Sequence, residues 1–386
     1  MRGVSSGGAR ATRRAFCLGT ACAALGGCRL FEGGEGGGGE YSVAVLGDTH
    51  YDAEPESVYH SHYDESNKWA AIQHSEFRRN GEMWRERCPR LLAASAELAR
   101  AMKTDFVLQM GDIIQGDCDD PPTHAKMLRD CMEMLRRPYP KGLPFLTVMG
   151  NHDFRGKGAR KAYMEFAEPH MSAETAAAAR ASARKPVSYP AFSFWRGDDL
   201  WVFCDFETTD LSPVIDCIER GADARHTFLV THGPFTTPDA PSFDWRLGGR
   251  AQCSALRPGL YELLSRRRAV VLSGHTHTTT WFLHKNRFGS FCEFTSNSVW
   301  AKAELATGEA IHRTPEEYGS LTLPKLDEER AGKFKAHLDF FRPGLKGYFF
   351  SKAAGHCRLD VSDSSVRMSF YPGDARTAAC SFPLKV

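Results

Sequence analysis

The 386-residue sequence lacks a surplus of charge of either sign, with 49 Lys and Arg against 47 Asp and Glu. Four of the arginines lie in residues 1–27, which hold no acidic residue, so the rest of the chain carries 45 basic and 47 acidic side chains. Non-specific binding to nucleic acid needs a basic surface that displaces counterions. We therefore expect no general affinity for nucleic acid, although the charge balance leaves nucleic acid open as a substrate.

The sequence also lacks any pair of cysteines in CxxC spacing. Twelve cysteines occur, of which Cys17, Cys22 and Cys28 lie near the N-terminus, and the remaining nine are an odd number. Neither a zinc knuckle nor a fully paired disulfide framework is indicated. The composition, 42% hydrophobic and 25% charged, is that of a globular protein, and we expect most of the nine cysteines to be buried as small hydrophobic side chains.

A long apolar run is missing near the N-terminus. The stretch from Ala15 to Gly27 is too short to span a bilayer, and it overlaps the segment Thr12–Leu18, which resembles a twin-arginine export motif. Leu25–Cys28 then resembles a bacterial lipobox, in which the cysteine is diacylated. The resemblance implies that residues 1–27 are an export signal and that Cys28 is lipidated.

A glycine-rich segment follows, and residues 28–41 are predicted to be a flexible tether. Together these features predict an exported lipoprotein, held by a lipid anchor at Cys28 on the periplasmic or cell-surface side of a bacterial envelope. Residues 42–386 are predicted to form a single domain with insertions at about 51–90 and 300–345. The sequence does not indicate an oligomeric state.

Beyond the tether, short apolar runs alternate with helical patterns, which is typical of α/β architecture. Continuous apolar character over four or five residues favours strands buried on both faces. A second group of predicted strands, in the last third of the chain, suggests a second sheet. The first runs are Val43–Leu46, Phe106–Met110, Phe145–Met149, Phe228–Thr231 and Ala269–Ser273, and the second group is Trp281–Leu283, Phe291–Thr295, Tyr348–Ser351, Cys357–Val361 and Val366–Tyr371.

Each of the first five runs is followed directly by a short block that contains glycine together with histidine, aspartate or asparagine. Because sites in open α/β sheets form at the carboxyl ends of strands, we expect these side chains to converge on one crevice. Asp, Asn and His without Cys favour Mn, Fe or Zn, and seven candidate ligands suit two metals that share a carboxylate. The blocks are Gly47-Asp48-Thr49-His50, Gly111-Asp112, Gly150-Asn151-His152-Asp153, His232-Gly233 and Gly274-His275-Thr276-His277.

In this order the blocks resemble the signature of the calcineurin-like metallophosphoesterase superfamily, which reads D-x-H, GD, GNH[DE], H and GHxH. The resemblance implies a four-layer α/β/β/α sandwich of two mixed β-sheets. It further implies a dinuclear metal centre that hydrolyses phosphoesters with a metal-bridging hydroxide. By the same resemblance Asp48, His50 and His277 hold the first metal, Asn151, His232 and His275 hold the second, and Asp112 bridges the two.

His152 matches the superfamily histidine that donates a proton to the leaving oxygen or stabilises its charge. Many members read GDxxD, with the last Asp orienting that histidine, but this chain has Gln115 there, so the orienting role is expected to pass to Gln115 or Asp153. No tyrosine stands at that position, which argues against a purple-acid-type site. Asp117 and the acids that follow it are expected to form a solvated loop.

The segment 51–90 directly follows His50, so we expect it to leave from the rim of the site. Its aromatic and basic residues predict a lid over the substrate, or alternatively a loop that packs onto the domain. Tyr51 and Arg155 are candidates for substrate contact. The predicted substrate is a small phosphoester, with phosphodiesters slightly favoured over phosphomonoesters; the alternatives are a non-catalytic ligand- or partner-binding lipoprotein and an extracellular nuclease.

Overall fold

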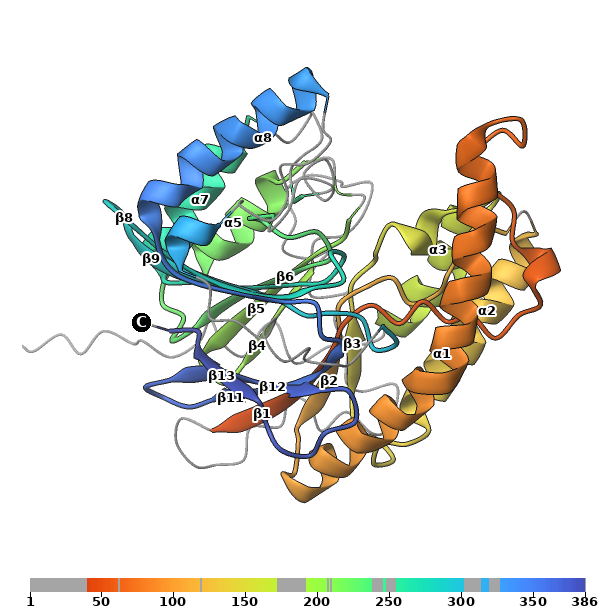
Figure 1. The fold of residues 1–386 in the computed structure, drawn as a ribbon. Helices are drawn as coiled ribbons and strands as arrows, with labels where there is room; N and C mark the ends of the chain where they lie inside the picture. Colours follow the sequence, from red (N-terminus) through yellow and green to blue (C-terminus); the bar gives the residue numbers. More distant parts are fainter. Residues whose placement is uncertain are drawn as a thin grey trace, which may run out of the picture.

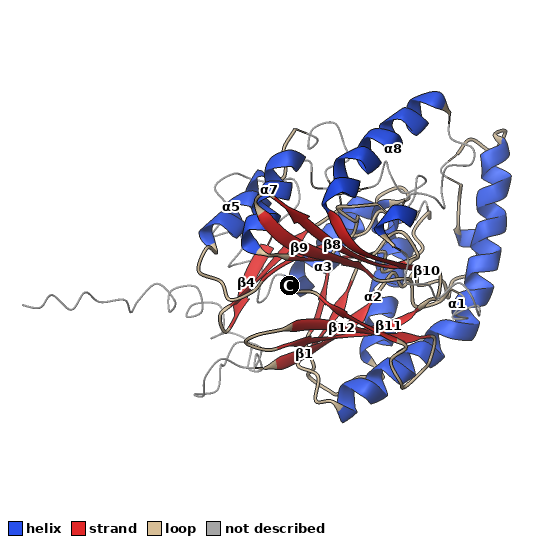
Figure 2. Cartoon of the chain, turned by 60° about the vertical axis from the view of Figure 1, so that its left-hand side comes forward, coloured by secondary structure: helices blue, strands red, loops and turns tan. Residues whose placement is uncertain are grey.

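Two mixed β-sheets pack face to face between two layers of helices (Figures 1 and 2), which confirms the predicted four-layer α/β/β/α sandwich. The structure is a computed structural model. It describes residues 40–61, 63–118, 120–171, 192–206, 208, 210–237, 246–247, 255–301, 314–318 and 327–385.

Several predicted features lie outside these described residues. They include the export signal at 1–27, the lipidation site Cys28 and most of the tether at 28–41. Much of the predicted insertion at 300–345 is also outside them. Across the part of the chain that the structure describes, no helix is both long enough and apolar enough to cross a membrane.

The first sheet has the strand order β13-β12-β11-β1-β2-β3. Strands β1, β2 and β3 run parallel to one another, and β11, β12 and β13 add to the edge of β1 in antiparallel pairs. The bounds are β1 Tyr41–Leu46, β2 Phe106–Gln109, β3 Phe145–Thr147, β11 Gly355–Val361, β12 Val366–Pro372 and β13 Cys380–Pro383.

The second sheet has the order β10-β8-β9-β7-β6-β5-β4. Its centre, β5, β6, β7 and β9, is parallel, and antiparallel strands stand at both edges. The bounds are β4 Phe192–Arg196, β5 Asp199–Cys204, β6 Thr227–Thr231, β7 Val270–Ser273, β8 Thr279–Asn286, β9 Gly289–Thr295 and β10 Leu345–Ser351.

The late strands do not form a sheet of their own, so that part of the sequence interpretation is wrong. Strands β8, β9 and β10 join β6 and β7, whereas β11 and β12 pair with β1. An apolar run defines a strand but carries no information on its partner, because pairing depends on the path of the chain between strands. As a result, the five strand ends that carry the motifs come from two sheets.

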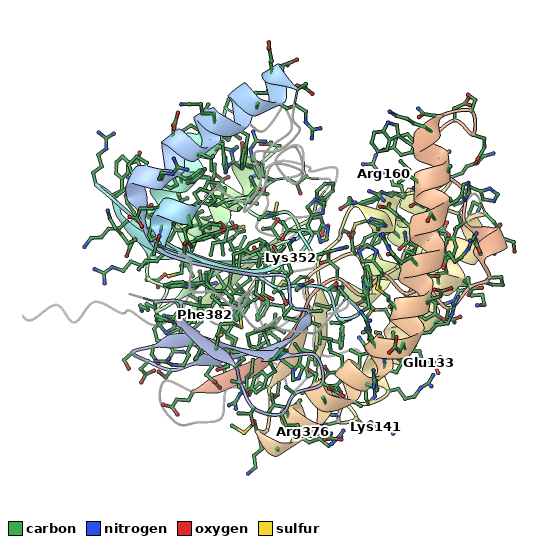
Figure 3. All side chains as sticks on the ribbon, viewed as in Figure 1. Glu133, Lys141, Arg160, Lys352, Arg376 and Phe382 are labelled. Carbon is green, nitrogen blue, oxygen red and sulfur yellow. The ribbon has the colours of Figure 1, made fainter. Side chains whose placement is uncertain are left out.

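The core has one layer between the sheets and one beneath each set of helices. Val43 and Val45 of β1 face the other sheet, while Leu46 faces the helices, as expected of a strand buried on both faces. Phe382 lies in the layer between the sheets (Figure 3). Among the described cysteines, seven are buried and Cys380 is partly exposed, so the expectation that most cysteines are buried is confirmed for them.

Helices α1 and α2 cover the first sheet with α3 packed on α2, and α5, α7 and α8 cover the second (Figure 1). In the described segments, four short 3-10 turns lie in the connections. The bounds are α1 Lys68–Ala101, α2 Pro121–Arg136, α3 Ala159–Met171, α5 Ser212–Arg220, α7 Arg257–Arg267, α8 Glu328–Phe341, η1 Glu56–Val58, η2 His152–Phe154, η5 Pro315–Glu317 and η6 Arg342–Gly344.

The segment 51–90 is mostly helical. After η1, the 34-residue helix α1 begins at Lys68, where the side chain of Asn67 accepts a hydrogen bond from the Trp69 amide. Its buried face includes Phe77 and Trp84. Charged residues and Pro89 interrupt the apolar pattern of this segment, so the sequence analysis predicted a lid or a packed loop there and not the first part of a helix.

Candidate metal centre

The polar strand ends of both sheets meet at one place. β1, β2 and β3 deliver the blocks around Asp48, Asp112 and Asn151, and β6 and β7 deliver those around His232 and His275. β1, β2 and β3 are parallel to one another, and so are β6 and β7, so within each sheet the carboxyl ends of these strands lie at the same edge. The expected convergence therefore occurs, although it takes place between two sheets.

The backbone around these residues is unusual. Four candidate ligands have positive φ angles, His50 at 44°, Asp112 at 49°, His275 at 73° and His277 at 49°. Such angles are uncommon for residues other than glycine, and they cluster at functional sites where the surrounding structure enforces them. The glycine at 274 is needed for another reason, because a Cβ atom there would overlap the Asp48 carboxylate.

The first group of candidate ligands is Asp48, His50, Asp112 and His277. The Nε2 atoms of His50 and His277 are 3.0 Å apart, and His277 Nε2 is 3.1 Å from Asp48 Oδ2. His50 Nε2 also lies 3.4 Å from Asp112 Oδ2. Their ligand atoms all lie within 4.8 Å of one another, which is close enough for one cation to contact every member.

The second group is Asp112, His232 and His275, with Asn151 beside it. His232 Nε2 is 3.2 Å from Asp112 Oδ2, 3.1 Å from Asn151 Oδ1 and 3.2 Å from His275 Nδ1. The other nitrogen of His232 lies 2.7 Å from the Met110 carbonyl oxygen, to which it donates, so Nε2 keeps its lone pair in neutral imidazole.

Asp112 belongs to both groups, and its two oxygens are used differently. Oδ1 accepts a hydrogen bond of 2.7 Å from the His152 amide, whereas Oδ2 faces His50 on one side and His232 on the other. One carboxylate oxygen thus lies between two sets of imidazole nitrogens. This is the position expected of a ligand shared by two metals.

The charges of the site fit a pair of cations. Burial lowers the pKa of His50 to about 4 and of His275 to about 3, so both stay neutral, as metal-ligating imidazoles must be. Burial also opposes a charge on His232, but Asp112 and Asp48 outweigh it and raise the pKa of His232 to about 9. The buried carboxylates therefore favour positive charge at this point, and the donor set of imidazole, carboxylate and amide suits Mn, Fe or Zn.

His152 lies next to the first group, with its ring 4.3 Å from that of His50. Its Nδ1 is 2.8 Å from the main-chain oxygen of Gln115, whereas the side-chain nitrogen of Gln115 is 3.5 Å away. The contact that orients His152 therefore comes from the backbone at position 115. Burial and the nearby Arg155 guanidinium hold the pKa of His152 well below its usual range.

Asp153 does not contact His152 in the way the sequence interpretation considered. Its Oδ1 accepts hydrogen bonds from the amides of Ile113 and Ile114 at 2.8 and 3.1 Å, and Oδ2 accepts one from Gly150 at 2.9 Å. Burial and the nearby charge of Asp112 raise the pKa of Asp153 to about 8. Asp153 thus ties the loop after β2 to the loop after β3, and so fixes the spacing between Asp112 and His152.

Two further expectations concern the rim. Asp117 is only 1% exposed and lies 3.6 Å from Arg155 Nη1, so the prediction that it belongs to a solvated loop is wrong. Tyr51 is 8% exposed and its ring packs edge-on against Trp84 of α1. Arg155 is placed beside His152, with its Nη1 3.4 Å from His152 Nδ1.

The sequence interpretation missed two aromatic rings that pack on the candidate ligands. Phe206, after β5, lies 5.7 Å from the rings of both His232 and His275. Trp300, after β9, lies 5.6 Å from His50 and 5.4 Å from His277. Both β5 and β9 are parallel to the strands that carry ligands, so a search of every strand end would have found them.

The site agrees with similarities to known proteins. Residues 41–279, more than half of the chain, match the family described as calcineurin-like phosphoesterase. Among solved structures, PhoD is similar at 12% identity and a TM-score of 0.53, over 90% of this chain and 70% of that one. No curated protein matches the sequence.

Two other solved structures are similar over about nine-tenths of this chain. One is a purple acid phosphatase from yellow lupin seeds, at 11% identity and a TM-score of 0.49 over 90% of this chain and 54% of that one. The other is a dimetal phosphatase from Danio rerio, at 11% identity and a TM-score of 0.45 over 89% and 98%. At these identities, the similarity to PhoD concerns the fold alone.

Proposed function

The chain belongs to the calcineurin-like phosphoesterase family and is a metal-dependent phosphoesterase, and from this premise we propose that it hydrolyses a small phosphoester outside the cytoplasm. Within that class we favour phosphodiesters slightly over phosphomonoesters, because the GDxxD arrangement of many phosphatases is replaced here by a sequence with Gln115.

The observation that carries this proposal is the position of Asp112. One of its oxygens lies 3.4 Å from His50 Nε2 and 3.2 Å from His232 Nε2, so a single carboxylate is available to two metal positions. We assign Asp48, His50 and His277 to one metal and Asn151, His232 and His275 to the other, with Asp112 shared. Two Mn, Fe or Zn ions held there supply Lewis acidity that activates water and neutralises charge on the phosphoryl group.

The remaining chemistry belongs to the chain itself. Because Nδ1 donates to the Gln115 carbonyl oxygen, His152 can give a proton from Nε2 only as the imidazolium. We propose that binding of the anionic phosphoester stabilises this form, which then protonates the leaving oxygen. This main-chain contact orients the ring without a carboxylate. Asp153 supports the reaction from a distance, because it holds the two loops that carry Asp112 and His152 in register.

The test is hydrolysis of a nitrophenyl phosphomonoester and a bis-nitrophenyl phosphodiester by protein stripped of metal and reloaded separately with Mn, Fe or Zn. Metal-restored turnover is expected, and the ratio of the two rates reports which ester class the site prefers. Two bound metals without turnover on either ester would instead favour a binding lipoprotein. The near-neutral charge gives no support to the nuclease alternative.

The location of the protein is part of the proposal. It rests on the arginine pair Arg13-Arg14, the short apolar stretch after it and the lipobox-like Leu25–Cys28. The Cys28→Ser variant is expected to move from the membrane fraction to the soluble fraction of the producing cells. Equal membrane association of the variant and the unchanged chain would overturn the lipid anchor.

A further inference from the structure

A cation stands beside His152, next to the Nδ1 atom of its ring. Arg155 follows η2, and its Nη1 lies 3.4 Å from His152 Nδ1 and 3.6 Å from Asp117 Oδ2. The side chain is 28% exposed. Within the described part of the chain, its other guanidinium nitrogens make no hydrogen bond, so they remain available to a ligand in the solvent.

Asp117 holds this arginine by both its main chain and its side chain. The Asp117 amide donates to the Arg155 carbonyl oxygen at 3.1 Å, and its carboxylate faces Nη1. Asp117 has a φ of 56°, and the preceding Gly116 has a φ of 67° and lies so close to His152 that a Cβ atom would overlap its carbonyl oxygen. The loop at Gly116 and Asp117 therefore has a strained backbone and lies in close contact with His152, the proposed proton donor.

Residues of α1 and of the segment before it form hydrogen bonds with Asp117. Gln73 of α1 donates to Asp117 Oδ2 at 3.3 Å, and Ser61 donates to Gln73 Oε1 at 2.7 Å. The amide of His60 also donates to the Asp117 carbonyl oxygen, at 2.6 Å. Arg155 thus stands at the end of a series of polar contacts that runs from the surface, through a buried carboxylate, to the side of His152.

In this ion pair the acid is buried and the cation faces solvent, so a ligand can reach the guanidinium. A guanidinium presents paired N–H groups that match the oxygens of a phosphate or carboxylate. Because His152 is assigned to the leaving oxygen, an anion bound to Arg155 would belong to the leaving group and not to the scissile phosphoryl group. This step rests on the proposed function.

We propose that Arg155, positioned by Asp117 and Gln73, is a specificity residue that binds an anionic group on the leaving group. The substrate class is therefore a phosphoester whose leaving group carries a phosphate or carboxylate of its own. Asp117 and Gln73 are positioning residues, since they act through Arg155.

Two pairs of substrates test this assignment, because the members of each pair differ only by a charged group on the leaving side. Adenosine 3′,5′-bisphosphate is compared with adenosine 5′-monophosphate, and 4-carboxyphenyl phosphate is compared with phenyl phosphate. The unchanged protein is expected to show a higher kcat/KM for at least one charged member, and the pair that responds tells a phosphate from a carboxylate.

The variant Arg155→Met is expected to reduce that preference by about tenfold or more, the loss expected for a charge-assisted hydrogen bond. Arg155→Lys keeps the charge without the paired N–H groups, so it should retain part of the preference. Lys157→Met is the matched control, because it removes an exposed cation two residues away and should leave the preference unchanged. Asp117→Asn should lower the preference while keeping more of it than Arg155→Met.

Arg155→Met leaves the Asp117 carboxylate buried without its cation, which can destabilise the fold. The double variant Asp117→Asn/Arg155→Met removes both charges, so it tests the loss of the guanidinium without an unpaired buried carboxylate. The binding of the two adenosine nucleotides to metal-free protein, measured by calorimetry, separates this inference from the proposed function. Absence of metal-restored turnover would sink the proposed function alone. A preference unchanged within twofold in both Arg155 variants, by kinetics or by calorimetry, would overturn the role of Arg155.

Discussion

The two loops that carry His152 and His232 are supported in contrasting ways. The loop after β3 is held by the buried Asp153, and it then reaches the surface at Arg155, whose guanidinium lies beside the buried Asp117 of the loop after β2. The loop after β6 is held by Glu293 of β9, which is fully buried and accepts hydrogen bonds from the amides of residues 235 and 236 at 2.6 and 2.8 Å.

Side chains from other elements pack against the loop after β6. Arg257 of α7 donates to the Phe235 carbonyl oxygen at 2.9 Å and lies over the Phe235 ring, and Tyr318 donates to the carbonyl oxygen of Thr237 at 2.7 Å. Both loops therefore use a buried carboxylate that gathers backbone amides. The first loop continues to the solvent-facing charge of Arg155, so we infer that amide-binding carboxylates fix ligand positions while the exposed cation affects which substrate is accepted.

The largest expected effect falls on the residue that both sides of the centre share. Asp112→Asn should remove at least one of the two metals and lower turnover by on the order of 10³-fold or more, because the bridging oxygen is replaced by a weaker ligand. Metal content by mass spectrometry and turnover with the nitrophenyl esters measure both effects. Asp339→Asn, an exposed position on α8, is the control. Two bound metals with full activity in Asp112→Asn would show that the carboxylate is not shared.

The next effect concerns the first loop alone. His152→Ala should lower kcat by roughly 10²–10⁴-fold on esters with poor leaving groups and by less on nitrophenyl esters, whose leaving group needs little protonation. Metal content should stay at two, since His152 is outside the ligand set. Equal losses on good and poor leaving groups would remove the proton-donor role and leave His152 as a packing residue beside His50.

The smallest expected effect concerns the loop after β6 and changes the free energy of unfolding. Burial raises the pKa of Glu293 to about 7, against the opposing effect of its hydrogen bonds to the loop. A carboxyl whose folded pKa exceeds its unfolded value stabilises the protein below the unfolded value, and this contribution is lost as the pH rises through about 7. Glu293→Gln should destabilise the fold by about 1–3 kcal/mol at pH 5, because one amide of the loop then faces an NH₂ group.

The pH dependence sharpens that prediction. Glutamine does not titrate, so the difference in unfolding free energy between the unchanged protein and Glu293→Gln should narrow from pH 5 to pH 8. Urea denaturation at both pH values measures it, with Glu329→Gln on the exposed face of α8 as control. A difference that stays constant with pH would mean that Glu293 has an ordinary pKa in the folded protein, which would contradict its role as the buried carboxyl that holds the second loop.

Much of the site could be predicted because its candidate metal ligands directly follow the apolar runs that form strands. Asp48, Asp112, Asn151, His232 and His275 each follow an apolar run within a few residues, so strand assignment alone placed them at one edge. Arg155 was only a candidate by proximity, and Phe206 and Trp300 were missed because neither residue type signals a metal centre. Gln115 contacts His152, as one of the two alternatives expected, but through its main chain, which residue type does not reveal. The Asp153 carboxylate binds backbone amides instead of His152.

The presence of a metal site at the strand ends follows from the amino-acid sequence alone, since residue types and their spacing from strand ends are local properties that select donor atoms and architecture. Tertiary structure alone decided which strands share a sheet, which oxygen of Asp112 faces both sets of imidazoles, and that Asp117 is buried. These depend on contacts between segments far apart in the chain. Asp117 is the plainest case, because it takes Gln73 of α1 and Arg155 after β3 to turn an acidic loop residue into a buried support beside His152.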